Sequence, residues 1–116
     1  MTYEQALTQI GVDKEETLQR FSGNEELMKK FIKKFPQDKT TSELEKAALE
    51  KDYKAIEETA HTLKGLSGNL GFSKLFELSS ALVNAIRAKD YYTADQLSPK
   101  IIDLSHSIQN TLNGLN

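Results

Sequence analysis

Residues 52–71 of this 116-residue chain read DYKAIEETAHTLKGLSGNLG. The apolar side chains recur at spacings of three and four, which is the period of an amphipathic α-helix. A helix from about Asp52 to Gly68 is predicted, with Asn69-Leu70-Gly71 closing it. On a helical wheel, one side of this segment collects Ile56, Thr59, Leu63, Leu66 and Leu70. We therefore expect a long helix that packs against a core along that side.

His61 falls opposite the apolar side, so we expect an exposed imidazole on a firmly packed helix. Its face also carries Lys54, Glu57, Glu58, Lys64, Gly65 and Gly68. A glycine inside a helix costs about 1 kcal/mol relative to alanine, and the usual return is close approach by another backbone or a ligand. Gly68 could instead simply end the helix. A nucleophilic nitrogen, a nearby cation and a cleared surface suit a transferred phosphoryl group.

The segment from Ala60 to Gly71 resembles the signature of histidine-containing phosphotransfer (HPt) domains. Further similar positions run from about residue 11 to residue 86. They are Gly11-Val12-Asp13, Leu18, Arg20-Phe21, Gly23-Asn24, Phe31, Phe35, Leu49–Tyr53, Ala55-Ile56, Leu75, Leu78 and Leu82. Val83 departs from the family pattern, since many relatives carry an acidic residue at this position. Residue 83 is expected to lie on the surface, and the departure leaves only the detail of that surface open.

The resemblance implies a phosphorelay carrier. His61 would accept a phosphoryl group from the aspartyl phosphate of a response-regulator receiver domain and pass it to another receiver aspartate. Lys64 would assist with the phosphoryl charge, and the partner-docking face would include Gly65, Gly68, Glu57 and Glu58. Neutral imidazole is a good nucleophile near neutral pH. Phosphoryl transfer relies mainly on positioning and charge neutralisation, so no cofactor is expected on this chain, and the receiver would supply Mg²⁺.

The rest of the chain also has helical periodicity. Fifteen Leu and nine Ala against two Val favour helix over strand. Three further helices are expected over residues 3–10, 14–21 and 73–88. A fourth is capped by Asn24 and interrupted at Pro36. Two more are expected to start at the capping boxes Thr40–Glu43 and Thr93–Gln96. The third should bury Leu27, Met28, Phe31, Ile32 and Phe35, and Pro99 should lie in the first two turns of the last. Short connections predict an all-α fold: an up-and-down antiparallel four-helix bundle, one domain over residues 1–116, with short extra N-terminal helices.

The composition of the chain excludes or disfavours several classes of partner and site. Fifteen basic residues against seventeen acidic ones give a net charge of −2, which does not favour binding to nucleic acid or anionic membranes. The absence of Cys excludes disulfides and cysteine-bound zinc. No apolar run is long enough to span a bilayer, and no signal peptide is recognised at the N-terminus, so a cytoplasmic location is expected. A monomer is expected because the core of such a bundle is internal. Lys29, Lys30, Lys33 and Lys34 form a basic edge that is expected to be solvated.

Three other kinds of chemistry could use a histidine such as His61. A hydrolase is disfavoured because Ser67 points toward the bundle and no nucleophile elbow exists. A metal site is disfavoured because the only other histidine, His106, lies on a different helix, where it is expected to be an ordinary surface residue. Kinase motifs are absent, so the chain is not expected to be an enzyme that uses ATP. The alternative from another class is a non-catalytic helical adaptor, which would never carry acid-labile phosphate.

Overall fold

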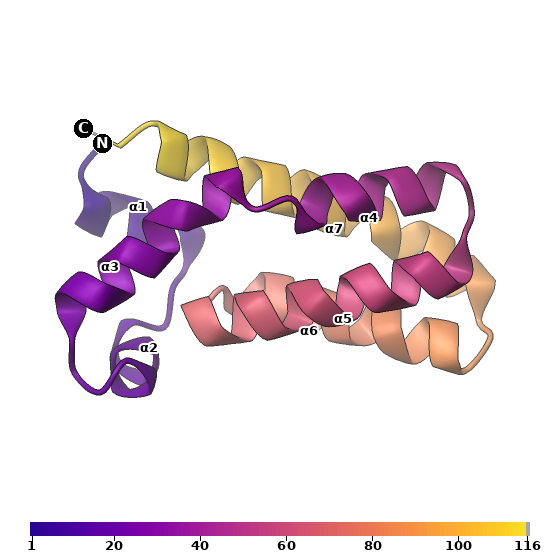
Figure 1. The fold of residues 1–116 in the computed structure, drawn as a ribbon, viewed down its shortest axis with the longest axis horizontal. Helices are drawn as coiled ribbons and strands as arrows, with labels where there is room; N and C mark the ends of the chain where they lie inside the picture. The colour runs from indigo at the N-terminus through magenta and orange to yellow at the C-terminus, as the bar shows by residue number, and fades with distance from the viewer. Residues whose placement is uncertain (116) are drawn as a thin grey trace.

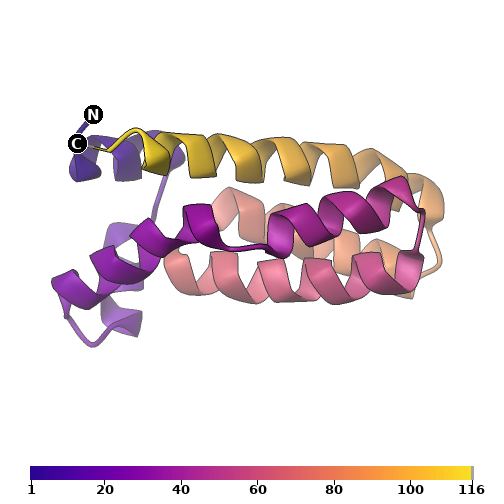
Figure 2. The same cartoon turned by 45° about the horizontal axis from the view of Figure 1, so that its top comes forward.

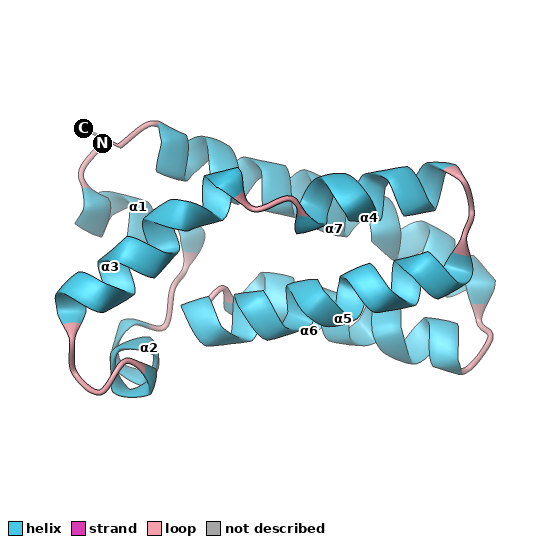
Figure 3. Ribbon diagram, viewed as in Figure 1, coloured by secondary structure: helices cyan, strands magenta, loops and turns pink. Residues whose placement is uncertain are grey.

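The computed structural model describes residues 1–115, and these residues contain helices and turns but no strand (Figure 3). The α-helices are α1 (Tyr3–Ile10), α2 (Lys14–Arg20), α3 (Glu25–Lys34), α4 (Thr40–Leu49), α5 (Tyr53–Leu70), α6 (Ser73–Arg87) and α7 (Tyr91–Asn113). A short 3-10 turn, η1 (Phe35–Gln37), separates α3 from α4 at the predicted proline interruption.

The four helices α4 to α7 run alternately up and down and pack side by side, with α5 and α6 in the most extensive contact (Figures 1 and 2). The N-terminal helices α1, α2 and α3 gather at one end of this bundle. At that end the Met1 amino group donates a hydrogen bond to the Gly114 carbonyl at 3.4 Å. The predicted all-α four-helix bundle with extra N-terminal helices is confirmed.

The buried side of α5 is rotated slightly from its predicted position. Its fully buried residues are Ile56, Ala60, Leu63, Ser67 and Leu70. The two remaining residues of the predicted stripe, Thr59 and Leu66, are only half buried. Helices α4 and α6 both pack on α5. Two of the buried residues of α5, Ala60 and Ser67, have small side chains.

Two of the predicted helix caps are wrong, and aspartates explain both, although α4 itself begins at Thr40, within the predicted limit. The carboxylate of Asp38 accepts the Thr40 amide at 2.8 Å, so Thr40 is not the capping residue of α4. Asp90 caps α7 and accepts both the amide and, at 2.6 Å, the hydroxyl of Thr93. Because α7 begins at Tyr91, Pro99 lies beyond its first two turns, inside the helix. The Asp95 carbonyl therefore lacks the amide donor that a residue other than proline would offer.

The predicted stripe of α3 is only partly buried. Met28 and Ile32 lie in the core with Phe35, whereas Leu27 and Phe31 are exposed. The Phe31 ring instead stacks on Phe21, with the ring centroids 5.7 Å apart. The four basic residues of α3 are exposed, as expected. The Asn24 cap is also confirmed, since its side chain accepts the Leu27 amide at 3.0 Å.

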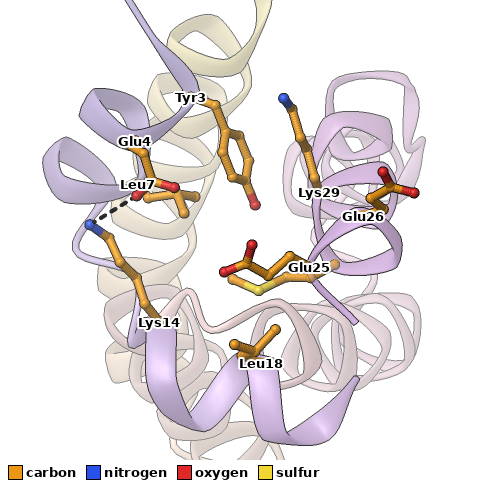
Figure 4. Close-up of a pocket in the computed structure, with 9 residues that line it drawn as sticks. Tyr3, Glu4, Leu7, Lys14, Leu18, Glu25, Glu26 and Lys29 are labelled. Carbon is orange, nitrogen blue, oxygen red and sulfur yellow. Dashed lines mark ion pairs between the residues drawn. The ribbon is translucent and has the colours of Figure 1, made fainter. Parts of the chain in front are cut away.

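A hollow of about 350 Å³ lies among α1, α2 and α3 (Figure 4). Tyr3 and Glu25 point into it, and Lys14 pairs with Glu4 at its rim, with 3.4 Å between nitrogen and oxygen. The Tyr3 hydroxyl is buried without a hydrogen-bond partner. Burial, with smaller contributions from the nearby Glu4 and Glu25 charges, raises the pKa of Tyr3 to about 12. None of the predicted site residues lines this hollow, so it is separate from the face that carries His61.

Among residues 1–115, no helix combines the length and the apolar character that crossing a bilayer would require.

Candidate functional site

Both ends of α5 are fixed by side chains or by glycine geometry. At its start the Asp52 carboxylate accepts the Ala55 amide at 3.1 Å. At its end Gly71 adopts a left-handed conformation with φ of 79°. A Cβ at Gly71 would collide with the Thr17 side chain, so glycine is required there for space as well as for conformation. The suggestion that Gly68 ends the helix is therefore wrong, because Gly68 lies inside it.

Helix α2 holds the last turn of α5. Arg20 donates from Nε to the Asn69 carbonyl at 3.3 Å, which satisfies an acceptor that a helix C-terminus leaves free. The Asp13 amide donates to the Gly71 carbonyl at 3.4 Å. Sequence reasoning did not assign these contacts, because the residues that make them are far apart along the chain.

His61 is exposed in the middle of this fixed helix, as predicted, while its neighbour Ala60 is fully buried. Among the described residues, His61 makes no ion pair, whereas His106 lies 3.6 Å from Glu45. The imidazole of His61 is thus presented to solvent on a helix that cannot easily shift. That arrangement suits a nucleophile that must meet a group carried by another protein.

Lys64 lies beside His61 on the α6 side of the helix. Its ammonium nitrogen is 6.0 Å from the centroid of the Phe76 ring, at the outer limit of a cation–π contact. No carboxylate in residues 1–115 forms an ion pair with Lys64. Sequence reasoning missed Phe76, although an aromatic residue outside the leucine stripe of α6 was a usable signal.

The two glycines of the predicted docking face have different surroundings. A Cβ at Gly65 would meet nothing within 4 Å, so this glycine opens the surface beside His61. A Cβ at Gly68 would lie 3.1 Å from Cδ2 and 3.3 Å from Cε2 of Phe76. Gly65 therefore has no internal packing role, whereas Gly68 makes room for a ring from α6.

Glu57 and Glu58, the two acidic residues of the predicted docking face, point toward different neighbouring helices. Glu57 points toward α6, where its Oε2 lies 3.4 Å from Nε of Arg87. Glu58 is exposed on the α4 side, where it lines a shallow hollow with Glu43 and Lys46. The structure therefore brings Lys64, Gly65 and Gly68 together beside His61, with Glu57 bound to Arg87 one turn earlier and Glu58 turned toward another groove.

Val83 belongs to the core and not to the surface, contrary to the sequence-based interpretation. It is 1% exposed. The Glu57–Arg87 ion pair and the Gly68–Phe76 contact set an antiparallel register that brings residue 83 level with His61. An acid at this position would have to be buried, so valine is the residue that suits this packing.

Ser67 and His106, which the competing chemistries would use, both contact other residues of the chain. The Ser67 hydroxyl is fully buried and donates to the Leu63 carbonyl at 2.7 Å, so it is not available as a nucleophile. In the part of the chain that the structure describes, no three His, Asp or Glu side chains are grouped as metal ligands. His106 is half buried and, besides approaching Glu45, contacts Gln109 at 3.3 Å, so it helps to join α7 to α4.

Comparison with known proteins gives one match. The family model described as "Hpt domain" matches residues 26–114, which run from α3 to the end of α7 and include the whole His61 face. No match was found among curated proteins or among solved structures. The family match extends beyond residue 86, where the resemblance in the sequence ended, but it does not include the similar positions between residues 11 and 24.

Proposed function

Because this chain belongs to the Hpt domain family, whose members carry phosphoryl groups on histidine in two-component relays, we propose that His61 is its phosphoacceptor. His61 would take the group from the aspartyl phosphate of one receiver domain and pass it to an aspartate of another. The observation that carries this proposal is the exposed imidazole, which makes no ion pair with the described residues 1–115, on a helix fixed at both ends. His106, which is tied to Glu45 and Gln109, is a poorer candidate.

The chemistry needs one ring nitrogen and a partner. The lone pair of a neutral His61 nitrogen attacks phosphorus, the bond from phosphorus to the aspartyl oxygen breaks, and the aspartate leaves as a carboxylate. The reverse sequence with a second receiver returns the imidazole. The carrier thus gains and loses the phosphoryl group without ATP, and no ATP-dependent kinase activity of its own is needed.

Charge on this face supports such a transfer. Within residues 1–115 the Lys64 ammonium has no carboxylate partner, so it can approach phosphoryl oxygens as a point charge. Glu57, one turn before His61, is paired with Arg87, which reduces its repulsion of an incoming phosphoryl group. Mg²⁺ in the receiver would supply most of the neutralisation, and no cofactor is proposed on this chain.

The partners proposed are response-regulator receiver domains, with a hybrid sensor histidine kinase as a further candidate. The open surface at Gly65 provides the space for a receiver to bring its aspartate to the imidazole. We further propose that the chain works as a cytoplasmic monomer, since its apolar side chains are mostly used in its own core.

The experiment that tests this function is transfer from receiver domains that have been phosphorylated by a small-molecule phosphodonor in the presence of Mg²⁺. Wild-type chain should acquire phosphate that is labile in acid and stable in base. His61→Gln should keep its helix content and acquire none, whereas the control His106→Gln should be labelled like wild type. Labelling of His61→Gln would contradict the assignment. No labelling of wild type across a complete receiver set would favour the non-catalytic adaptor.

A further inference from the structure

We propose that Phe76 is a positioning residue for phosphoryl transfer, whose ring, seated on Gly68, holds the Lys64 ammonium at the His61 face. This inference rests on the proposed function of His61. Phe76 comes from α6, so the arrangement joins a side chain of the neighbouring helix to the helix that carries the phosphoacceptor.

The ring has a fixed seat because residue 68 lacks a side chain. A Cβ on residue 68 would lie 3.1 Å from Cδ2 and 3.3 Å from Cε2 of Phe76, which is closer than ordinary van der Waals contact. The ring therefore packs directly on the backbone of α5, one turn beyond Lys64. A ring held against backbone can move less than one that projects into solvent.

The fixed position of the Phe76 ring matters because it restricts the Lys64 ammonium, which would otherwise move freely. A lysine ammonium is carried on four flexible methylene groups, and ordering it costs conformational entropy. The face of an aromatic ring attracts a cation without neutralising it, unlike a carboxylate. Lys64 and His61 are three residues apart and so are neighbours on the helix surface. The Phe76 ring, which lies level with Gly68, thereby keeps a positive charge on the face that carries the imidazole, on the Gly68 side of Lys64.

Phe76 is not explained by the core. Its neighbour Leu75 is fully buried, while Phe76 remains 38% exposed. Its other potential use is direct apolar contact with a docked receiver. The two uses make different predictions, because a ring that acts through Lys64 has no effect once Lys64 is removed.

The first measurement concerns the chain alone and does not depend on transfer. In the wild type, the Cε protons of Lys64 should show an upfield NMR shift from the Phe76 ring current. Phe76→Leu should abolish this shift, and Phe76→Tyr, which keeps the ring, should retain it. Unchanged Lys64 resonances in Phe76→Leu would overturn the proposal, whatever the outcome for His61.

The second measurement is a double-mutant cycle on the transfer rate, with the receiver that phosphorylates wild type fastest as the donor. A cation–π contact at an exposed site corresponds to roughly a two- to fivefold effect, so Phe76→Leu should slow transfer by about that factor. Phe76→Tyr should restore the rate. Combined with Lys64→Ala, Phe76→Leu should cause no further loss.

Independent, multiplying losses in the double variant would overturn the positioning role and indicate direct contact of Phe76 with the receiver. Melting curves of all variants check that each is folded. If Phe76→Leu is unstable, the Lys64 ring-current shift of the wild type keeps the test decisive, because its absence would overturn the proposal. Failure of the proposed function would look different: wild type itself would accept no phosphate, while the Lys64 ring-current shift would still be present.

Discussion

Gly65 and Gly68 lie three residues apart on α5, yet only Gly68 has a side chain of another helix against its backbone. A glycine at either position weakens the helix to the same degree. The difference between them is therefore a difference in surroundings: open solvent beside His61 at one position and the Phe76 ring at the other.

Alanine substitution should separate these two roles. Gly65→Ala should raise the free energy of unfolding by up to about 1 kcal/mol, because it adds helix propensity and meets no neighbour. For a domain of this size that corresponds to a rise of about 4 °C in melting temperature. Gly68→Ala should gain less or become less stable, because Phe76 must shift. Equal gains in thermal melts would show that the ring yields without cost.

A larger residue at Gly65 should block the partner without harming the fold. Gly65→Gln should be at least as heat-stable as wild type and should transfer phosphate poorly, since a displacement of about 1 Å between reacting groups can cost about 10²-fold in rate. A melting curve and a transfer assay on the same preparation test this. Normal transfer by a stable variant would mean that the receiver docks on another side of the helix.

Lys64 should assist transfer without being essential. Lys64→Ala should slow phosphoryl transfer to and from His61, because it removes the cation beside the imidazole, and should leave the circular dichroism spectrum unchanged. Lys54→Ala is the control, since Lys54 is an exposed lysine on the same helix that lies two turns before His61. Equal rates for wild type and Lys64→Ala would identify Lys64 as an ordinary surface residue.

Tyr3 should make the fold sensitive to alkaline pH. Its pKa is raised from 10.0 to about 12 in the folded chain, mainly by burial of the hydroxyl, so folding favours the neutral form. Its contribution to stability is complete below pH 10 and is lost as pH rises from 10 to 12. Denaturant titrations should show that Tyr3→Phe weakens this decline.

The same Tyr3→Phe variant should lose no stability at pH 7, where the native hydroxyl is buried without a partner. The pKa of Tyr53 is also raised, chiefly by desolvation and by a hydrogen bond to Asp95, so part of the alkaline decline should remain. An identical decline in wild type and Tyr3→Phe would remove Tyr3 as its cause.

The helices, the bundle and the exposure of His61 could be predicted because they depend on local periodicity. Helix starts were less predictable where two capping residues compete. Asp38 precedes Thr40 and Asp90 precedes Thr93, and in each case the carboxylate accepts the threonine amide. A Ser/Thr-x-x-Glu/Gln pattern does not by itself decide which residue caps the helix.

The second half of the site could not be predicted because it depends on how α5 and α6 align. Phe76 and Arg87 reach the His61 face only in the observed antiparallel register. The sequence of α5 contains Lys64 and Glu57 but no sign of their partners. Val83 was assigned to the surface for the same reason: its level relative to His61 and its burial follow from packing between helices.

The contacts of α2 with the end of α5 link two distant parts of the chain in a single cooperative unit. Arg20 holds the Asn69 carbonyl and Asp13 donates to Gly71, although both belong to the segment that precedes the family match. If α1 and α2 detach, the last turn of α5 loses the hydrogen bonds from Arg20 and Asp13 and can fray. Amide hydrogen exchange in residues 69–72 should therefore report the opening of the N-terminal helices, even though those amides lie at and just after the end of the helix that carries the phosphoacceptor.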